Sequence, residues 1–232
     1  MTTLRGAAAF LRARRGTIAV VLLLVLFAVL TAFATSPGLR REDVEASRLL
    51  QRADTPVLTA LAEGFTYLGS GAGLVIVGLP VLFLLARARK PVAAWLFAAT
   101  VPGHLLNVLI KSVINRPRPG DLDLVLVLLP AGGSSFPSGH AQAATMYFGF
   151  LAVLIGIHVR SERLRHGGIG VCVLIGAAIC VSRVYLGAHF VSDVVGGVAV
   201  GLLFLWAWVQ FYRRFGAQEF APTLLNSTAG DL

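Results

Sequence analysis

Three short groups of polar residues interrupt an otherwise apolar stretch, and their side-chain types suit the binding and cleavage of a phosphate. The groups are Lys111 with Arg118-Pro119, then Pro137-Ser138-Gly139-His140, and then Ser182-Arg183 with His189 and Asp193. Ionisable residues within or beside membrane-spanning segments are costly, so their presence indicates function. Each group is consistent with one part of a phosphate site.

The third group pairs a histidine with a carboxylate. His189 and Asp193 are four residues apart, so on a helix they would share a face. A carboxylate bound to one imidazole nitrogen fixes the tautomer and leaves the other nitrogen as a nucleophile. Arg183, near the end of the preceding apolar run, could hold an anion through its planar guanidinium group. A polar loop at a membrane surface would also explain these residues.

The second group lies where an apolar helix is expected to begin. Ser138 and Gly139 there would offer backbone N–H groups to a phosphate and allow its close approach. His140, in the same first turn, suits a general acid for a leaving alkoxide and then a general base for water. Helices often begin with such residues without any function, so this group alone is a weak signal.

The first group supplies positive charge. Lys111 lies near the end of an apolar run, and Arg116 and Arg118 follow in an Arg-Pro-Arg-Pro stretch whose prolines stiffen the loop. Positioned cations stabilise the non-bridging oxygens during phosphoryl transfer without requiring a metal. Cationic side chains that extend to lipid headgroups would explain these residues equally well.

The composition indicates that membrane-spanning helices position the three groups. The 232 residues are 56% hydrophobic and 13% charged, whereas soluble domains carry about 25% charged residues. Backbone groups in lipid must be hydrogen-bonded internally, so apolar runs near 20 residues predict helices. We therefore predict an all-α, polytopic membrane protein with one domain over residues 1–232 and its catalytic motifs within 111–193. The six predicted transmembrane helices cover approximately residues 17–34, 57–85, 92–114, 139–157, 168–185 and 190–212.

The positive charge follows the pattern of a plasma-membrane protein rather than of a nucleic-acid-binding protein. The net charge is +9, but most of it lies in short clusters between apolar runs, near residues 12–15, 87–90, 160–165 and 213–214. Such clusters mark cytoplasmic loops. Both termini are therefore expected in the cytoplasm, and the three polar groups at the extracytoplasmic ends of the helices.

Other segments carry more local expectations. Residues 36–56 have mixed charge and permit an amphipathic surface helix, and Gly69-Ser70-Gly71 divides the second apolar run into a tilted helix or a short helix leading into a longer one. The basic start and first apolar run fit either a first transmembrane helix or a cleaved signal peptide. The GxxxG of Gly197 and Gly201 indicates helix packing.

Two weaker patterns each have two interpretations. His104, Asn107 and Lys111 lie on nearly one helical face, which could line the floor of a substrate cavity or form a polar contact between helices. The apolar patch from Leu122 to Leu129 could enter lipid beside the site or pack as an ordinary loop.

Together, the three groups resemble the three-part signature of the type 2 phosphatidic acid phosphatases, a family that shares its site with vanadium-dependent haloperoxidases. All three motifs match without a substitution: Lys111-x6-Arg118-Pro119, Pro137-Ser138-Gly139-His140 and Ser182-Arg183-x5-His189-x3-Asp193. The chain is most similar in size to small bacterial members such as the phosphatidylglycerophosphate and undecaprenyl pyrophosphate phosphatases. Residues 1–90 carry no motif of that family.

The resemblance implies a role for each matched residue. His189 would attack phosphorus and form a phosphohistidine, Asp193 would orient that imidazole, and His140 would protonate the leaving oxygen and then activate water. The residues implied to hold the phosphate oxygens are Lys111, Arg118, Ser138, Gly139 and Arg183. Ser182 would supply only a supporting hydrogen bond, and the role of Arg116 stays open.

The resulting expectation is a lipid phosphatase that needs no metal or other cofactor. Its substrate would be phosphatidylglycerol phosphate, phosphatidate or undecaprenyl pyrophosphate. A lipid phosphotransferase with the same intermediate and a non-enzymatic carrier of phosphorylated lipids are the alternatives. The head group, the chain length and the oligomeric state stay open.

Overall fold

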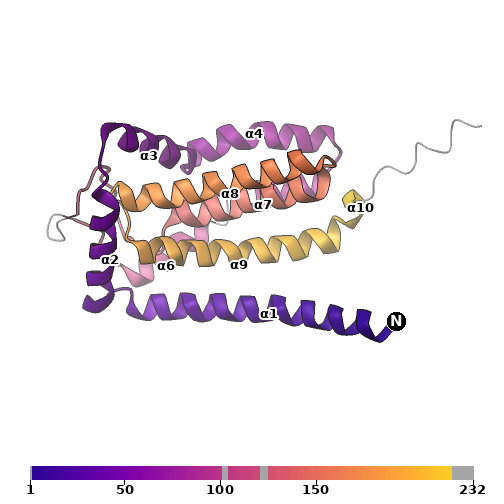
Figure 1. The fold of residues 1–232 in the computed structure, drawn as a ribbon, viewed down its shortest axis with the longest axis horizontal. Helices are drawn as coiled ribbons and strands as arrows, with labels where there is room; N and C mark the ends of the chain where they lie inside the picture. The colour runs from indigo at the N-terminus through magenta and orange to yellow at the C-terminus, as the bar shows by residue number, and fades with distance from the viewer. Residues whose placement is uncertain (1, 101–103, 121–124, 221–232) are drawn as a thin grey trace, which may run out of the picture.

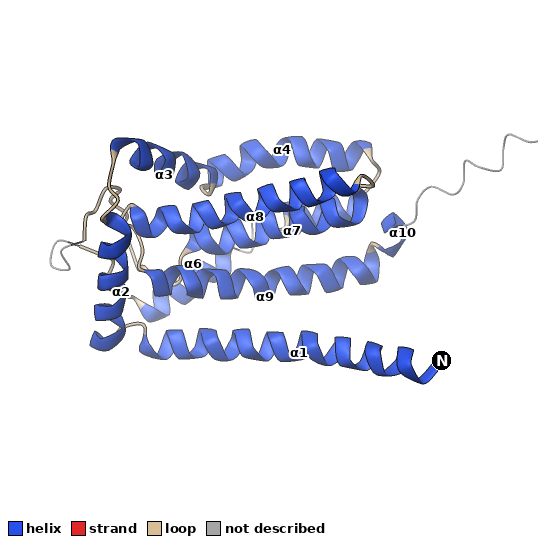
Figure 2. Ribbon diagram, in the orientation of Figure 1, coloured by secondary structure: helices blue, strands red, loops and turns tan. Residues whose placement is uncertain are grey.

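Long helices lie side by side along the greatest dimension of the molecule, and one shorter helix, α2, crosses their end (Figures 1 and 2). This computed structural model describes residues 2–100, 104–120 and 125–220, and its secondary structure over those residues is entirely helical. The predicted all-α class is therefore confirmed. The helices are α1 (Thr2–Phe33), α2 (Pro37–Gln51), α3 (Pro56–Leu68), α4 (Gly71–Arg87), α5 (Pro91–Ala98), α6 (His104–Ile114), α7 (Gly139–His158), α8 (Glu162–Tyr185), α9 (Val191–Phe215) and α10 (Ala217–Phe220).

Within the part of the chain that the structure describes, four helices are long and apolar enough to cross a membrane. They are α1, over its part Gly16–Phe33, and the whole of α7, α8 and α9. A fifth span results if α3 and α4, which meet at an angle of 63°, are taken as one broken span. The chain is therefore a multi-pass membrane protein by length and composition, whereas the number of six spans stays a prediction.

The third expected span, 92–114, is divided between two short helices. α5 has 8 residues and α6 has 11, and each is too short to cross a bilayer by itself. Residues 101–103, which join them, lie outside the described residues.

The second expected span is broken at the position that its glycines indicated. α3 ends at Leu68, and Ser70 begins α4 by accepting a hydrogen bond from the Gly73 N–H at 3.2 Å. A side chain at Gly73 would meet the backbone of Tyr67 and Leu68, so the glycine permits the bend. The observed arrangement is a short helix leading into a longer one.

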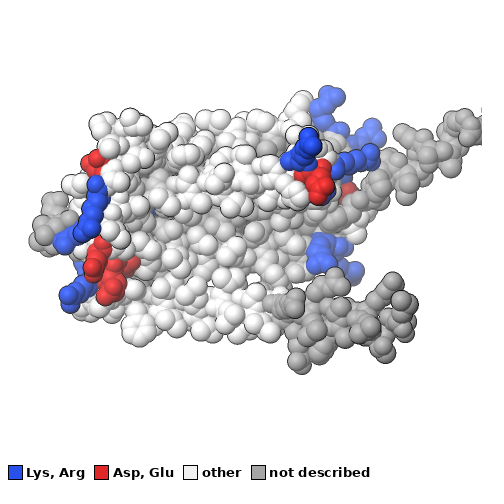
Figure 3. Space-filling model, in the orientation of Figure 1, with Lys and Arg blue, Asp and Glu red and all other residues white. Residues whose placement is uncertain are grey.

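The charged residues lie where a membrane protein requires them. In Figure 3 the Lys, Arg, Asp and Glu side chains gather at the two ends of the visible face, and the broad middle is uncharged. The N-terminus of α1 lies at the same end as α10, away from α2 (Figure 1). This distribution agrees with helices that cross lipid between two aqueous layers.

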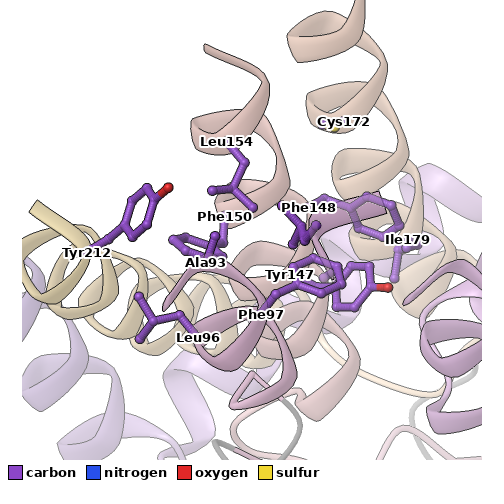
Figure 4. Close-up of a cluster of buried hydrophobic side chains, with 12 residues drawn as sticks. Ala93, Leu96, Phe97, Tyr147, Phe148, Phe150, Leu154, Cys172, Ile179 and Tyr212 are labelled. Carbon is purple, nitrogen blue, oxygen red and sulfur yellow. The ribbon is translucent and has the colours of Figure 1, made fainter. Parts of the chain in front are cut away.

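α7 packs against both α8 and α9 and forms the centre of the bundle. Figure 4 shows the buried side chains around it, in which Phe97 of α5 meets Tyr147 of α7 with ring centroids 4.5 Å apart. Lipid tails are as apolar as these side chains, so close packing rather than exclusion of water holds such helices together.

Small residues on α9 bring it against the start of α7. A Cβ at Gly197 would lie 2.4 Å from the carbonyl oxygen of Ser138, and one at Gly201 would lie 2.7 Å from the Cβ of Thr145. These glycines are a packing surface, as the GxxxG pattern indicated. The contact draws the second polar group toward the third.

α2 is the amphipathic helix expected within residues 36–56. Ser36 caps its start, and three polar side chains at intervals of four, Asp43, Ser47 and Gln51, are buried against the bundle. The Gln51 Nε2 donates to the carbonyl oxygens of Leu126 and Tyr185, both at 2.8 Å. α2 is thus hydrogen-bonded to the loop that contains Leu126 and to the C-terminal residue of α8.

The described part of the apolar patch packs as a loop. The N–H groups of Leu128 and Leu129 donate to the carbonyl of Leu186, and both side chains pack against the cluster that contains it. Residues 121–124 lie outside the described residues, so lipid contact by that part of the patch stays untested.

Candidate active site

Hydrogen bonds bring members of the three polar groups together at the end that α2 covers. The Ser138 N–H donates to the Asp193 carbonyl at 2.9 Å, which links the second group to the third. The Lys111 Nζ and the Arg118 Nη2 both donate to the Ser134 carbonyl, at 2.8 and 3.3 Å, which brings the two cations of the first group together.

His189 is not on a helix, contrary to the expectation that it would share a helical face with Asp193. α9 begins at Val191, and the Asp193 side chain turns back to accept the Phe190 N–H at 2.9 Å. The carboxylate therefore meets His189 by capping the helix start, and the N–H groups of a helix N-terminus favour a carboxylate there.

The His189 ring lies between a carboxylate and a guanidinium group. Its Nδ1 is 3.5 Å from the Asp193 Oδ2, an ion-pair distance that is too long for a good hydrogen bond. Its Nε2 is 3.2 Å from the Arg118 Nη1. If Nδ1 carries the proton, the lone pair of Nε2 accepts a hydrogen bond from Arg118. The same lone pair would attack phosphorus if His189 were the nucleophile.

Burial lowers the pKa of His189 to about 4, and the positive charges of Arg118 and Lys111 lower it further, whereas Asp193 opposes the shift. The side chain is only 2% exposed. The imidazole is therefore neutral at neutral pH, as a nucleophile must be.

Arg118 is held by the loop that precedes α7. Its Nε donates to the carbonyls of Gly132 and Gly133 at 3.0 Å each, and its Nη1 donates to Ala188 at 2.6 Å. These bonds place the guanidinium beside the His189 ring, although burial lowers the Arg118 pKa. The cation is therefore positioned where a phosphate on His189 would need it.

Arg183 is buried in the last turn of α8 and retains unused hydrogen-bonding capacity. Its Nη1 donates to the Thr66 hydroxyl at 3.1 Å, and that hydroxyl lies 2.7 Å from the Ser182 hydroxyl. Its Nε has no hydrogen-bond partner among the described residues. Such a buried donor costs roughly 1–3 kcal/mol, which an anionic ligand would recover.

The start of α7 supplies the remaining predicted residues. Ser138 is its N-cap, and the hydroxyl accepts the Ala141 N–H at 3.5 Å. Gly139 and His140 are the first helical residues, and both line a cavity of about 250 Å³ that Gly69 of the α3–α4 bend also lines. A Cβ at Gly69 would lie 3.2 Å from the His140 ring. The bend thus leaves space beside the proposed general acid.

The polar stripe on α6 divides between two roles. The Asn107 Nδ2 donates to the Gln142 Oε1 of α7 at 2.8 Å, which is the interpretation as a contact between helices. Lys111, one turn further on, instead reaches Ser134 in the loop. The side chain of His104 lies outside the described residues.

Sequence reasoning missed part of the site. Arg116, whose role was left open, is buried and donates from Nη1 to the Asp193 Oδ1 at 2.5 Å. Its Nη2 donates to the Asp43 Oδ2 of α2 at 2.7 Å. Thr66 of α3, which holds Arg183, was also missed. The spacing of Asp43 with Ser47 and Gln51 was the available signal, because three polar residues at intervals of four mark one face of a helix.

The arrangement can perform nucleophilic phosphoryl chemistry. It contains a neutral, oriented imidazole, a buried carboxylate, and guanidinium groups on two sides. Within the described ranges, no three His, Cys, Asp or Glu side chains are grouped as a metal site would need.

Comparison with known proteins agrees with this geometry. The PAP2 superfamily model matches residues 92–217. Phosphatidylglycerophosphatase B of Bacillus subtilis (strain 168) is 30% identical over 190 residues, which cover 78% of this chain and 88% of that protein. Decaprenylphosphoryl-5-phosphoribose phosphatase of Mycobacterium tuberculosis (strain ATCC 25618 / H37Rv) is 32% identical over 151 residues, which cover 64% and 77%.

The fold is also similar to a solved structure. The crystal structure of a transmembrane PAP2-type phosphatidylglycerolphosphate phosphatase from Bacillus subtilis superposes with a TM-score of 0.77 at 27% identity. The match covers 84% of this chain and 96% of the other. The chain therefore belongs to the PAP2 superfamily of phosphatases.

Proposed function

We propose that this protein is an integral membrane lipid phosphatase that releases phosphate through a phosphohistidine at His189. The observation that carries the proposal is the His189 ring, with Nδ1 facing Asp193 and Nε2 facing Arg118. A protein that only carried phosphorylated lipids would not require a neutral histidine oriented in this way.

In the first step, the His189 Nε2 forms a bond to phosphorus as the bond from phosphorus to the lipid oxygen breaks. His140 donates a proton to that leaving oxygen. Arg118 turns from Nε2 to the non-bridging oxygens, and Arg183 offers them its unpartnered Nε. Lys111, Ser138 and Gly139 complete the phosphate site.

In the second step, water attacks the phosphohistidine and the bond between phosphorus and Nε2 breaks. His140, now neutral, accepts a proton from that water, so inorganic phosphate leaves and both histidines return to their initial state. Asp193 stabilises the positive charge on the His189 ring while it carries the phosphoryl group. No metal is needed in either step.

A lipid is the proposed substrate because apolar surface adjoins the phosphate site. A groove of about 280 Å³ between α3 and α8 is lined mostly by apolar side chains and reaches Ser182, next to Arg183. An acyl or prenyl chain fits such a surface, and the matched relatives are named for lipid substrates. The candidate substrates are phosphatidylglycerol phosphate, phosphatidate and undecaprenyl pyrophosphate. The enzyme would act on them at the extracytoplasmic face of the plasma membrane.

The test is phosphate release by the detergent-purified protein with excess chelator present. The substrates are the three candidate lipids and decaprenylphosphoryl-5-phosphoribose, and the variants are His189→Ala and His166→Ala. His166 is an exposed histidine at the other end of the bundle and serves as a matched control. We expect chelator-resistant release that His166→Ala retains and His189→Ala reduces by at least about 10⁴-fold.

Three results would contradict the proposal. Chelator-sensitive release would mean that a metal takes part in the chemistry. Retained activity in His189→Ala would exclude the phosphohistidine. Transfer of phosphate to an added lipid or sugar acceptor, without release of inorganic phosphate, would identify a phosphotransferase.

A further inference from the structure

A buried guanidinium group lies between two carboxylates at the base of the site. Arg116 is 2% exposed, Asp43 is 4% exposed, and Asp193 is fully buried. The Arg116 Nη1 contacts the Asp193 Oδ1 at 2.5 Å, and its Nη2 contacts the Asp43 Oδ2 at 2.7 Å. The two carboxylates belong to elements 150 residues apart in the chain, α2 and α9.

These contacts decide which way the Asp193 carboxylate faces. Arg116 occupies Oδ1, while Oδ2 accepts the Phe190 N–H and faces His189. Because each of its two oxygens has its own hydrogen-bond donor, the carboxylate is fixed in one orientation. The oxygen opposite Arg116 is therefore the one presented to the imidazole.

Asp43 in turn holds Arg116 and the start of α9. Its Oδ1 accepts the Ser192 N–H at 2.9 Å, and its Oδ2 accepts the Ser192 hydroxyl at 2.5 Å. The Arg116 Nη1 also donates to that hydroxyl at 2.7 Å. Asp43, Arg116 and Ser192 thus form one closed network directly behind Asp193.

The charge of the network matters as much as its shape. A guanidinium paired with Asp193 alone would neutralise the carboxylate that must stabilise a positively charged phosphoimidazole. With Asp43 present, one cation is shared by two anions and the group keeps a net charge of −1. Low-dielectric surroundings make that charge effective at His189.

We propose that Asp43 and Arg116 are positioning residues of the reaction: they fix the orientation of Asp193 and maintain its negative charge. α2 is then part of the active site, although it carries no residue of the three motifs. This inference rests on the proposed function, because the orientation of Asp193 matters only if His189 is the nucleophile.

A merely structural ion pair would produce different kinetics. Removing it would lower the amount of folded enzyme and leave the turnover of each folded molecule unchanged. A positioning pair, by contrast, lowers kcat in the folded enzyme, slows formation of the phosphohistidine, and leaves KM nearly unchanged.

The main variant is Asp43→Asn, which keeps the shape of the side chain and removes its charge. We expect kcat to fall about 10- to 100-fold, as for other residues that orient a catalytic group, with KM changed less than about threefold. Rapid-quench measurement should show the same fall in the rate of phosphohistidine formation. Glu45→Gln, an exposed carboxylate two residues along α2, is the matched control and should stay within about twofold of wild type.

A double-variant comparison tests whether Asp43 acts through Arg116. If it does, Asp43→Asn combined with Arg116→Gln will be no slower than Arg116→Gln alone, because residues that act as a unit are not additive. If the kcat losses of the two single variants multiply in the double variant, Asp43 does not act through Arg116. Ser192→Ala, which leaves no buried charge unpaired, should lower kcat about 3- to 10-fold and serves if Asp43→Asn does not fold.

The outcomes separate this inference from the proposed function. Wild-type activity that His189→Ala abolishes, together with kcat within twofold of wild type in folded Asp43→Asn or Ser192→Ala, would overturn the inference alone. A wild-type protein that releases no phosphate from any lipid would overturn both.

Discussion

The two ends of the helical bundle bury polar groups in different ways. At the end that α2 covers, Arg183 and His189 are buried with atoms that have no hydrogen-bond partner among the described residues. At the opposite end, the buried carboxylate Glu219 of α10 accepts hydrogen bonds at both of its oxygens.

Glu219 caps the start of α5. Its oxygens accept the N–H groups of Val92 at 2.7 Å and Ala93 at 3.2 Å, and the hydroxyl of Tyr212 at 3.1 Å. The Lys90 Nζ donates to its backbone carbonyl at 2.5 Å. A carboxylate at a helix N-terminus is favourable, so this arrangement joins α10 to α5 and α9.

The difference shows how a structural polar cluster can be told from a functional one. A cluster that only holds the fold together fulfils its own hydrogen bonds, because every unmet buried group costs about 1–3 kcal/mol. The site end bears that cost at Arg183 and His189. The unpartnered Nε of Arg183 is the donor that a phosphate would use, whereas the unpartnered Nδ1 of His189 faces Asp193.

Among tests of this difference between the two ends of the bundle, Arg183→Lys should have the largest effect on activity. Lysine keeps the charge but lacks the planar group whose Nε is unpartnered, so kcat/KM should fall about 10- to 100-fold. Phosphate release with the preferred lipid is the measurement. The matched control is Arg163→Lys, an exposed position at the other end of α8, and an equal effect of the two substitutions would remove the special role of Arg183.

The unusual environment of His189 predicts a dependence of stability on pH. Its pKa is lowered to about 4 from an ordinary 6.5. Between these values the histidine is protonated in the unfolded chain and neutral in the folded protein. Stability that is complete above pH 6.5 is therefore lost progressively as the pH falls toward 4. At pH 5 the loss is about 2 kcal/mol, which corresponds to roughly 4–8 °C in Tm.

The measurement is thermal unfolding in detergent at pH 8 and pH 5, for wild type and for His189→Gln. The wild-type Tm should fall more than that of the variant, because glutamine does not titrate. Equal falls would show that His189 is not held neutral against its ordinary pKa.

The smallest expected effect on activity comes from Glu219→Gln at the opposite end. The amide loses one acceptor oxygen and the negative charge over the start of α5, so the Tm should fall by an amount equivalent to about 2 kcal/mol. Phosphate release per folded molecule should stay within twofold of wild type. A tenfold lower kcat would mean that the two ends are coupled, and it would contradict the assignment of a purely structural role to the Glu219 end.

Much of the fold and the site was predictable because it is local in the sequence. Apolar runs predicted α1, α7, α8 and α9, glycines predicted the bend between α3 and α4, and mixed charge predicted α2. The three motifs indicated the residues that the structure collects at one end, and the family they resemble is the family to which the chain belongs. The roles of those residues stay predictions until activity is measured.

Other features were not predictable because they depend on contacts between distant segments. Spacing suggested that His189 lies on a helix, whereas the chain reaches the helical conformation only at Val191. Hydropathy suggested one span over 92–114, whereas two helices divide it. A pattern of residue types reports an average preference over a window, and it does not locate the residue at which a helix begins or breaks.

The sequence by itself determined the helical class, the membrane character and the family, because apolar runs and motif residues can be identified in one dimension. Only the tertiary structure decided that Arg116 would lie between Asp193 and Asp43. Asp43 and Asp193 are 150 residues apart, and no local rule pairs a carboxylate on a crossing helix with one that caps another helix. Their meeting follows from α2 lying across the end of the bundle, which brings the Asp43 carboxylate to the buried guanidinium group that also holds Asp193.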